Sequence, residues 1–328
     1  MSTVEPSVRA EPMAKKPRLR RRPLSRDKIW AIVTLSPTLI LLGVFVYAFI
    51  FWTGWVSVSK WNSFIVNMSW NGLANFRAIF ASYRFQADLR NMVYFTIGFV
   101  LLCLVVGMLL AVLLDQKIRL EGLFRSIYLY PMAVSAAATG VVWSWLLNPA
   151  TGINLILKQF GVKNPPQWYL SPRFTPSGFH LFSIQGGMPL AFFAVLIATV
   201  WEWCGFTMAL YLAGLRAIPE EVKEAAVMDG AGPVRAFFSV ILPQLRAVTI
   251  TAIILLLASS LKVFDLLYAM TGPGPNFITD LPALNMFDTT FNGDAFAQGA
   301  AIAIVLLILV LIFVVPYLIS TLRREAQG

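Results

Sequence analysis

The sequence predicts an all-α, polytopic membrane protein with six transmembrane helices, and three observations support this fold class. Of its 328 residues, 58% are hydrophobic and only 13% are charged, with a mean hydropathy of +0.72. Soluble domains carry about 25% charged residues, so this composition excludes a soluble domain, a disordered chain, a collagen and a disulfide scaffold. Six apolar segments also reach the roughly 20 residues that span a bilayer. Finally, Lys and Arg are denser on alternate connections.

The six apolar segments predict spans at approximately residues 29–51, 91–114, 126–147, 190–212, 248–270 and 296–319. The first is too long for the apolar core of a signal peptide and lacks a small-residue cleavage site, so it is predicted to be a retained anchor. The third contains Pro131 and many small residues. Small residues allow helix backbones to approach closely, so we expect this helix to pack against protein.

The distribution of basic residues predicts that both termini are cytoplasmic. The inner segments of that topology, residues 1–28, 115–125, 213–247 and 320–328, hold 18 of the 26 Lys and Arg residues, whereas the longer outer segments hold 7. Residues 1–28 form a basic tail that accounts for much of the net charge of +10. Attraction to anionic lipid headgroups explains this tail better than binding to nucleic acid does. We expect residues 1–24 to be flexible, residues 29–320 to form the permeation domain and residues 321–328 to be a cytoplasmic end.

Cysteine, histidine and nucleotide motifs point away from enzymatic chemistry. Cys103 and Cys204 lie inside apolar runs and are predicted to be unpaired, buried thiols. His180 has no neighbouring Cys or His, so no metal site is expected. The chain has no Gly-Lys pair and therefore no phosphate-binding loop, and it has no Ser/His/Asp arrangement. The sequence thus predicts no catalytic residue and no cofactor of its own.

The connection 213–247 is too long and too patterned for an ordinary linker. Pro219 followed by Glu220 and Glu221 suits the start of a helix, where a missing N–H is tolerated and negative charge is favoured. Gly230 can take the left-handed conformation that ends a helix. Pro233 then opens a second helix over residues 234–240. Composition alone is also compatible with a surface amphipathic hairpin.

The spacing within this connection resembles the signature loop of importer-type ABC permeases. Glu224-Ala225-Ala226 is followed by Gly230 and then by Val240 and Leu242-Pro243, with Val240 standing where that pattern has Ile. The resemblance implies that the first helix is a coupling helix that docks on a separate ATPase subunit, which binds ATP and Mg²⁺. The coupling residues it implies are Glu224, Ala225, Ala226, Asp229 and Gly230.

Other segments resemble the sugar-permease branch of this family, in particular the subunit type like the larger maltose permease. They include Trp143–Asn154 near the third span, the Gly/Pro-rich turn 271–275, and the glucose/mannose-type stretches 115–122 and 264–265. The resemblance, which runs from about residue 29 to 320, implies a multi-pass inner-membrane subunit that imports a sugar. It also implies a second homologous permease, two ATP-binding subunits and an extracytoplasmic sugar-binding protein as partners.

Three ionisable residues, Glu202, Lys262 and Asp265, lie well inside predicted spans. Each costs about 2.5–3.5 kcal/mol at the bilayer centre unless it has a partner or a watery cavity. Lys262 and Asp265 could pair at i,i+3 on one helix, or all three could line a translocation cavity. The family resemblance implies a substrate path at the positions Glu202, Trp203, Phe206, Ser259, Ser260 and Val263.

For Trp143, Trp145 and Trp201, an interfacial or packing role is favoured over a role in that path.

Two other function classes remain open at this stage. An ATP-independent secondary sugar carrier would explain the charges inside the membrane as an ion relay, but it leaves the loop 213–247 without a role. A membrane enzyme is disfavoured because no catalytic group is present.

Overall fold

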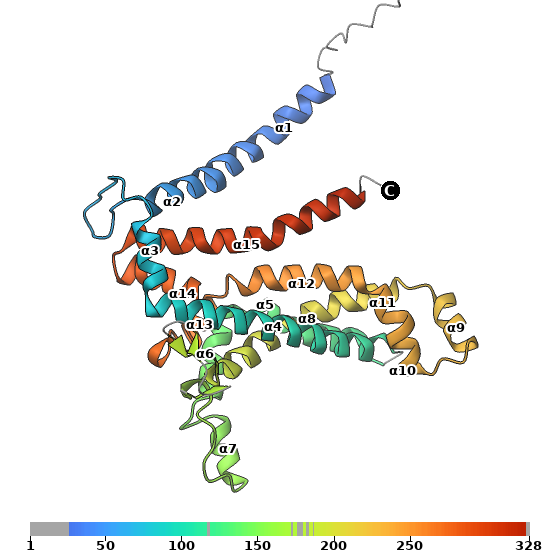
Figure 1. The fold of residues 1–328 in the computed structure, drawn as a ribbon. Coiled ribbons are helices and arrows are strands. Elements are labelled where there is room, and N and C mark those ends of the chain that lie inside the picture. Colours follow the sequence, from blue (N-terminus) through green and yellow to red (C-terminus); the bar gives the residue numbers. More distant parts are fainter. Residues whose placement is uncertain are drawn as a thin grey trace, which may run out of the picture. The chain divides into compact units, whose positions relative to one another are not determined.

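The structure, a computed structural model, describes residues 26–116, 119–171, 173–175, 180–181, 184–185 and 187–325 (Figure 1). The chain divides into two units, Met1–Phe51 and Trp52–Gly328. In the first, α1 (Arg26–Leu42) leads into a π-helical stretch, η1 (Gly43–Ala48). From Val33 onward the residues of α1 are mostly apolar and exposed, as expected of a lipid-facing helix. The tail predicted to be flexible, residues 1–24, lies outside the described residues.

Four helices in the described residues are long and apolar enough to cross a membrane, and the number rises to six if each of two bent pairs forms one span. The four are Val33–Ser57, which takes in α2 (Phe49–Ser57), α4 (Tyr83–Asp115), α8 (Ala191–Arg216) and Phe296–Pro316 of α15 (Phe296–Glu325). Each predicted span therefore has a helical counterpart. α4 begins at Tyr83 rather than at residue 91, and α15 continues through most of the predicted C-terminal tail.

Both bent pairs fall on predicted spans. The predicted third span falls on α5 (Glu121–Ala133) and α6 (Ala136–Leu146), which meet at 98°. Pro131 lies in the last turn of α5, where its ring prevents the helix from continuing regularly. α6 packs against α13 (Asp265–Met270), and a Cβ at Gly140 would lie only 2.5 Å from the Leu266 carbonyl oxygen. The expected close packing by small residues is confirmed for this face, while Val141 and Trp145 are exposed.

The second bent pair joins the connection 213–247 to α12 (Arg246–Ser260) at 66°. In that connection α9 (Glu220–Met228) is followed by α10 (Pro233–Ala236), the π-helical η3 (Phe237–Ile241) and α11 (Leu242–Gln244). The predicted helix, glycine turn and second helix are thus all present. α12 ends at Ser260, so the predicted fifth span, 248–270, is not one helix but two, separated by Leu261–Phe264.

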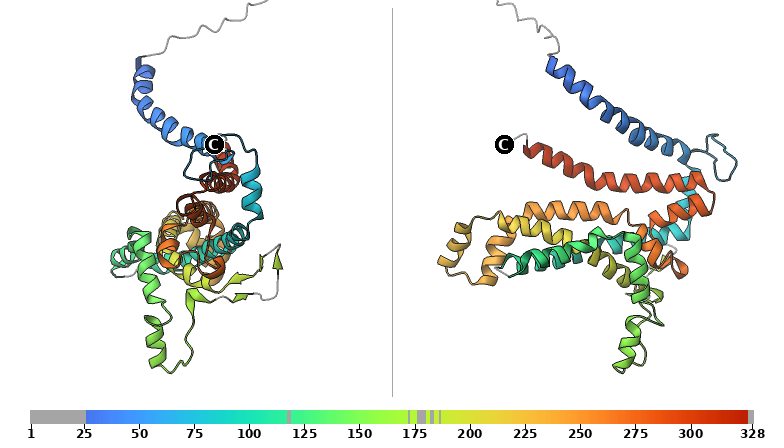
Figure 2. Two further views of the ribbon diagram at one scale, coloured as in Figure 1. Left: turned by 90° about the vertical axis from the view of Figure 1, so that its left-hand side faces the viewer. Right: turned by 180° about the vertical axis from the view of Figure 1, so that it is seen from behind.

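The buried core lies between α4, α8 and α12, which run side by side in both views of the bundle (Figures 1 and 2). Gly107 of α4 meets α8 so closely that a Cβ there would lie 2.7 Å from the Thr207 Cβ. Phe95, Phe99 and Phe192 fill the core nearer the amino-terminal ends of α4 and α8. Cys103 and Cys204 are unpaired and buried in this core, as predicted.

The remaining elements cluster at the end of the bundle opposite α9 and α10 (Figure 2). They are α3 (Ala74–Ala81), α7 (Ile153–Gln159), η2 (Trp168–Leu170), η4 (Pro275–Phe277), α14 (Pro282–Phe287) and the π-helical η5 (Asp288–Asn292). Two small antiparallel pairs complete the fold. β1 (Phe174–Thr175) pairs with β4 (Met188–Pro189), with Phe174 opposite Pro189, and β2 (His180–Leu181) pairs with β3 (Ile184–Gln185), with His180 opposite Gln185.

Candidate functional site

A cavity of about 240 Å³ lies where α6, α8, α12 and α13 meet, and we call it the central cavity. The break between α12 and α13 forms much of its wall, because the chain there leaves helical geometry and turns its side chains inward. Six of the predicted substrate-path residues line it: Glu202, Trp203, Ser259, Lys262, Val263 and Asp265. Four further residues complete the lining: Ala136, Thr199, Phe264 and Leu266.

Lys262 and Asp265 are not paired in the way that one sequence interpretation allowed. That interpretation placed them three residues apart on one helix, and it is wrong because α12 ends at Ser260 and α13 begins at Asp265. Neither residue takes part in any ion pair between described residues. Both side chains are exposed, while Glu202 is 8% exposed. The central cavity therefore presents two carboxyl groups and one ammonium group to whatever enters it.

Two predicted path residues lie beside the central cavity rather than on its wall. The Phe206 ring packs edge-on against Trp203, with ring centroids 6.0 Å apart, and so supports that indole from behind. Ser260 is buried, and its Oγ lies 2.9 Å from Thr96 Oγ1 and donates to the Leu257 carbonyl oxygen at 2.8 Å. Its hydroxyl thus links α12 to α4.

Sequence reasoning missed Thr199 and Phe264 as lining residues. Thr199 stands one helical turn before Glu202, so the period of α8 places both on one face and could have identified it. Phe264 was not detectable in the same way, because its position depends on the break in a segment that reads as one continuous apolar span.

The second candidate site is the loop formed by α9 and α10. Gly230 has φ +77°, the left-handed conformation predicted for it, and its N–H donates to the Val227 carbonyl oxygen at 2.9 Å. The next N–H, of Ala231, donates to the Ala226 carbonyl oxygen at 3.0 Å. These two bonds close the carboxyl end of α9 in the usual glycine-dependent manner and fix the direction in which the chain leaves.

A groove of about 360 Å³ lies between α9 and η3, and its lining includes three of the predicted coupling residues: Ala225, Ala226 and Asp229. Glu224 is exposed outside the groove. Arg216 Nη2 lies 2.7 Å from Glu121 Oε1, and Lys223 Nζ lies 3.9 Å from Asp115 Oδ2. These ion pairs connect Arg216 at the end of α8 and Lys223 of α9 to the facing ends of α5 and α4.

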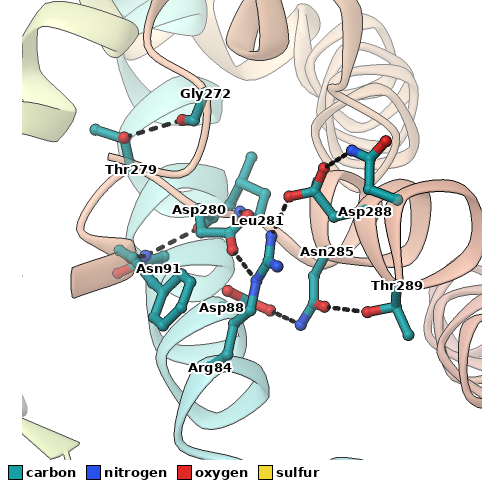
Figure 3. Close-up of polar contacts among 12 residues, drawn as sticks. Arg84, Asp88, Asn91, Gly272, Thr279, Asp280, Leu281, Asn285, Asp288 and Thr289 are labelled. Atoms are coloured by element: carbon teal, nitrogen blue, oxygen red, sulfur yellow. Dashed lines mark hydrogen bonds and ion pairs between the residues drawn. The ribbon is translucent and has the colours of Figure 1, made fainter. Parts of the chain in front are cut away.

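A buried charged cluster, which the sequence did not reveal, lies at the opposite end of α4 (Figure 3). Arg84 Nε lies 2.6 Å from Asp280 Oδ2, and Arg84 Nη2 lies 2.7 Å from Asp288 Oδ2. Asn285 donates to Asp88 in the same group. We call these five residues the Arg84 cluster. It joins the first turns of α4 to the segment before α14, to α14 itself and to η5.

Burial sets the electrostatics of the Arg84 cluster. Asp88 and Asp280 are both completely buried. Burial raises the pKa of Asp280, while the Arg84 guanidinium beside it acts in the opposite direction. The predicted second span begins at residue 91, so Arg84 and Asp88 fall outside it and the sequence did not reveal the cluster. The i,i+4 spacing of Arg84 and Asp88 on one helical face was the available signal.

The described residues contain no group of three or more His, Cys, Asp and Glu side chains placed to hold a metal ion. The groups that the central cavity offers to a ligand are hydrogen-bonding atoms, charged groups and aromatic rings.

Known proteins similar to this chain agree on its family. The profile of the family described as "binding-protein-dependent transport system inner membrane component" matches residues 103–325. A probable ABC transporter permease protein of Pyrococcus horikoshii is 35% identical over 94% of this chain and 100% of its own length. The trehalose/maltose transport system permease protein MalF of Thermococcus litoralis is 34% identical over 92% of this chain and 96% of its own.

Solved structures support the same fold. A chain of a bacterial ABC transporter involved in the import of the acidic polysaccharide alginate superposes with a TM-score of 0.74 at 18% identity, covering 91% of this chain and 96% of that one. The predicted all-helical importer-permease fold and the multi-pass inner-membrane location are thereby confirmed. The chain belongs to the binding-protein-dependent transport system inner membrane components, the permease subunits of ABC transporters.

Proposed function

We propose that this permease subunit forms one wall of the path by which an ATP-driven importer carries a sugar across the membrane. The observation that carries the proposal is the central cavity, where Glu202, Lys262 and Asp265 meet the rings of Trp203 and Phe264. Sugar hydroxyls need hydrogen-bond donors and acceptors, and the C–H face of a sugar ring packs on a flat aromatic surface. The central cavity supplies both.

The size of the central cavity suits part of a shared site. Pockets that enclose a drug-sized ligand measure about 300–1,000 Å³, and this one measures about 240 Å³. That volume fits a single sugar ring, or one side of a site that a second, homologous permease completes. We propose glucose, mannose or a short glucoside as the substrate. Relatives are named for xylose/arabinose, trehalose/maltose and glucose transport, which supports the sugar class.

The loop of α9 and α10 supplies the second half of the proposal. It would dock on one of two ATP-binding subunits, which bind ATP and Mg²⁺, while an extracytoplasmic sugar-binding protein delivers the substrate. The exposed Glu224 and the groove lined by Ala225, Ala226 and Asp229 offer a charged and an apolar contact to such a partner. Movement of the ATP-binding subunits would then alternate access to the central cavity.

The proposal is tested by uptake into proteoliposomes that hold the complete transporter and its binding protein. Radiolabelled glucose, mannose, maltose, trehalose and xylose are offered with and without ATP inside. We expect ATP-dependent uptake of at least one sugar, a loss of about tenfold or more in Glu202→Gln, and near-normal uptake in the control Trp201→Phe, whose ring lies outside the central cavity.

Three results would each overturn part of the proposal. Absence of uptake of every sugar in the panel would remove the substrate class. Uptake that persists without the ATP-binding subunits would instead favour an ATP-independent secondary carrier. An unchanged uptake rate in Glu202→Gln would remove the central cavity from the path.

A further inference from the structure

Four aromatic rings follow one another from the central cavity along α13, α14 and η5, and we call them the aromatic ladder. Phe264 stacks on Tyr268 with ring centroids 5.4 Å apart, and both pack on Phe287 at 5.0 and 5.5 Å. Phe287 in turn contacts Phe291 at 5.1 Å. The rings come from segments on either side of the connection 271–281, so their succession is a product of tertiary structure.

The aromatic ladder is continuous with the central cavity. Phe264 lines that cavity and also a second, apolar cavity of about 430 Å³ between the break Leu261–Phe264, α14 and α15, to which Lys262 and Phe287 contribute. Tyr268 stands one helical turn beyond Phe264 and Asp265. Phe291, in η5, forms the far end of the ladder.

Two of the four rings, those of Tyr268 and Phe291, are largely exposed. Tyr268 is 50% exposed and Phe291 is 63% exposed. Within the described part of the chain, no group forms a hydrogen bond with the Tyr268 hydroxyl. Next to Phe291 in the chain, the exposed Asn292 donates to Asp288 Oδ1 at 2.9 Å, so an amide and a carboxylate belong to the same η5 segment as that ring.

This combination of open aromatic faces and adjacent polar groups matches the chemistry of a carbohydrate. A lipid chain would need the rings but not the amide, the carboxylate or the phenol. A sugar ring uses both the aromatic rings and the polar groups, since its axial C–H groups contact an aromatic face while its hydroxyls reach donors and acceptors at the edge. The same pairing of groups defines the central cavity, to which the ladder leads.

We propose that the aromatic ladder is a second carbohydrate contact site, on which a pyranose ring rests at Phe291 and Tyr268 before it enters the central cavity at Phe264. The proposal rests on the sugar-import function proposed above. Successive stacked rings offer a moving sugar equivalent contacts at short intervals, so no single position holds it tightly. The ladder thus acts on the capture of sugar from the outer end.

The test measures uptake of maltose and glucose by the complete transporter in proteoliposomes, over a range of sugar-loaded binding protein. Tyr268→Leu and Phe291→Leu remove a ring and keep apolar bulk. Tyr268→Phe keeps the ring and removes only the hydroxyl. The control is Phe313→Leu on α15, where a ring of similar exposure, 46%, lies outside the ladder. Co-purification of all subunits reports assembly.

We expect each ladder-to-Leu variant to lower uptake at limiting substrate by roughly 2- to 10-fold, the range typical of one aromatic contact. Tyr268→Phe should retain more uptake than Tyr268→Leu, and Phe313→Leu should match the parent chain. Uptake equal to the parent in both Leu variants would overturn the ladder while leaving the proposed function intact. Loss of the second permease on purification would assign these rings to subunit packing instead. If the parent transports neither sugar nor any other in the panel, the proposed function fails first.

Discussion

Replacing Arg84 by Met tests how much the Arg84 cluster contributes to the fold. The guanidinium makes two charge-assisted contacts, of 2.6 and 2.7 Å, and one of them is to the fully buried Asp280. Such a bond contributes about 1.5–3 kcal/mol. Removing one partner of a buried pair costs about 3–5 kcal/mol, since the remaining charge is left without compensation. We therefore expect Arg84→Met to lose about 3–5 kcal/mol of unfolding free energy.

The assay is thermal unfolding of the purified chain in detergent, with its partner subunits bound. A loss of that size lowers Tm by roughly 6–20 °C on the scale of large domains. Arg77→Met is the matched control, because Arg77 is exposed on the adjacent α3 and makes no ion pair in the described structure. It should change stability by less than about 0.5 kcal/mol. Arg84→Met combined with Asp280→Asn should recover part of the loss, since one unpaired carboxylate is gone.

A Tm for Arg84→Met equal to that of Arg77→Met would refute this reasoning, because it would mean that water already solvates the cluster. A double variant less stable than Arg84→Met alone would show that Asp280 stabilises the fold through other contacts.

Three other predictions follow from single sites. Gly230→Ala should cost about 1–2 kcal/mol at the turn, because φ there is +77° although a Cβ would meet no atom. We expect sugar-stimulated ATPase activity to fall in this variant but not in the control Gly232→Ala, where φ is −64° and space is equally open. Equal stimulation in the two variants would contradict the coupling role. Ser259→Ala should lower sugar uptake several-fold and leave Tm unchanged, whereas Ser260→Ala should mainly lower Tm by removing the contact to α4; the reverse pattern would exchange their roles. Because burial raises the pKa of Asp280, the folded chain holds a proton that the unfolded chain releases, and the stability this group contributes is lost as pH rises from about 4 through its raised pKa. Tm measured against pH should fall less steeply over that interval in Asp280→Asn, and an identical slope would show that Asp280 does not titrate there.

The sequence predicts the helices and the α9–α10 loop well because both depend on local signals. Apolar length identifies each span, and Gly230 followed by Pro233 identifies the turn, since these residues restrict the backbone whatever surrounds them. Pro131 likewise marks the place where the third span bends. Each of these features can be recognised within a short window of the chain.

Features that depend on tertiary contacts were not predictable in this way. The break after Ser260 lies in a segment predicted as one span, and no proline or glycine marks it. Phe264 therefore reaches the central cavity by a route that periodicity does not show. The partners of Arg84 lie about two hundred positions along the chain, at Asp280 and Asp288, and only the folded arrangement brings them together.

The break at Leu261–Phe264 also determines what fills the central cavity before any sugar arrives. In the described structure, the backbone amides of Val263 and Phe264 donate to no protein acceptor, and such groups are tolerated at membrane depth only beside protein or water. The exposed Lys262 and Asp265 lie at the same place. Under the proposed function, a sugar that enters the central cavity would take the place of water at these groups. Selectivity then depends on how well a given arrangement of hydroxyls reproduces the hydrogen bonds of the water it displaces, so a deoxy sugar of the same size should be disfavoured at each missing hydroxyl.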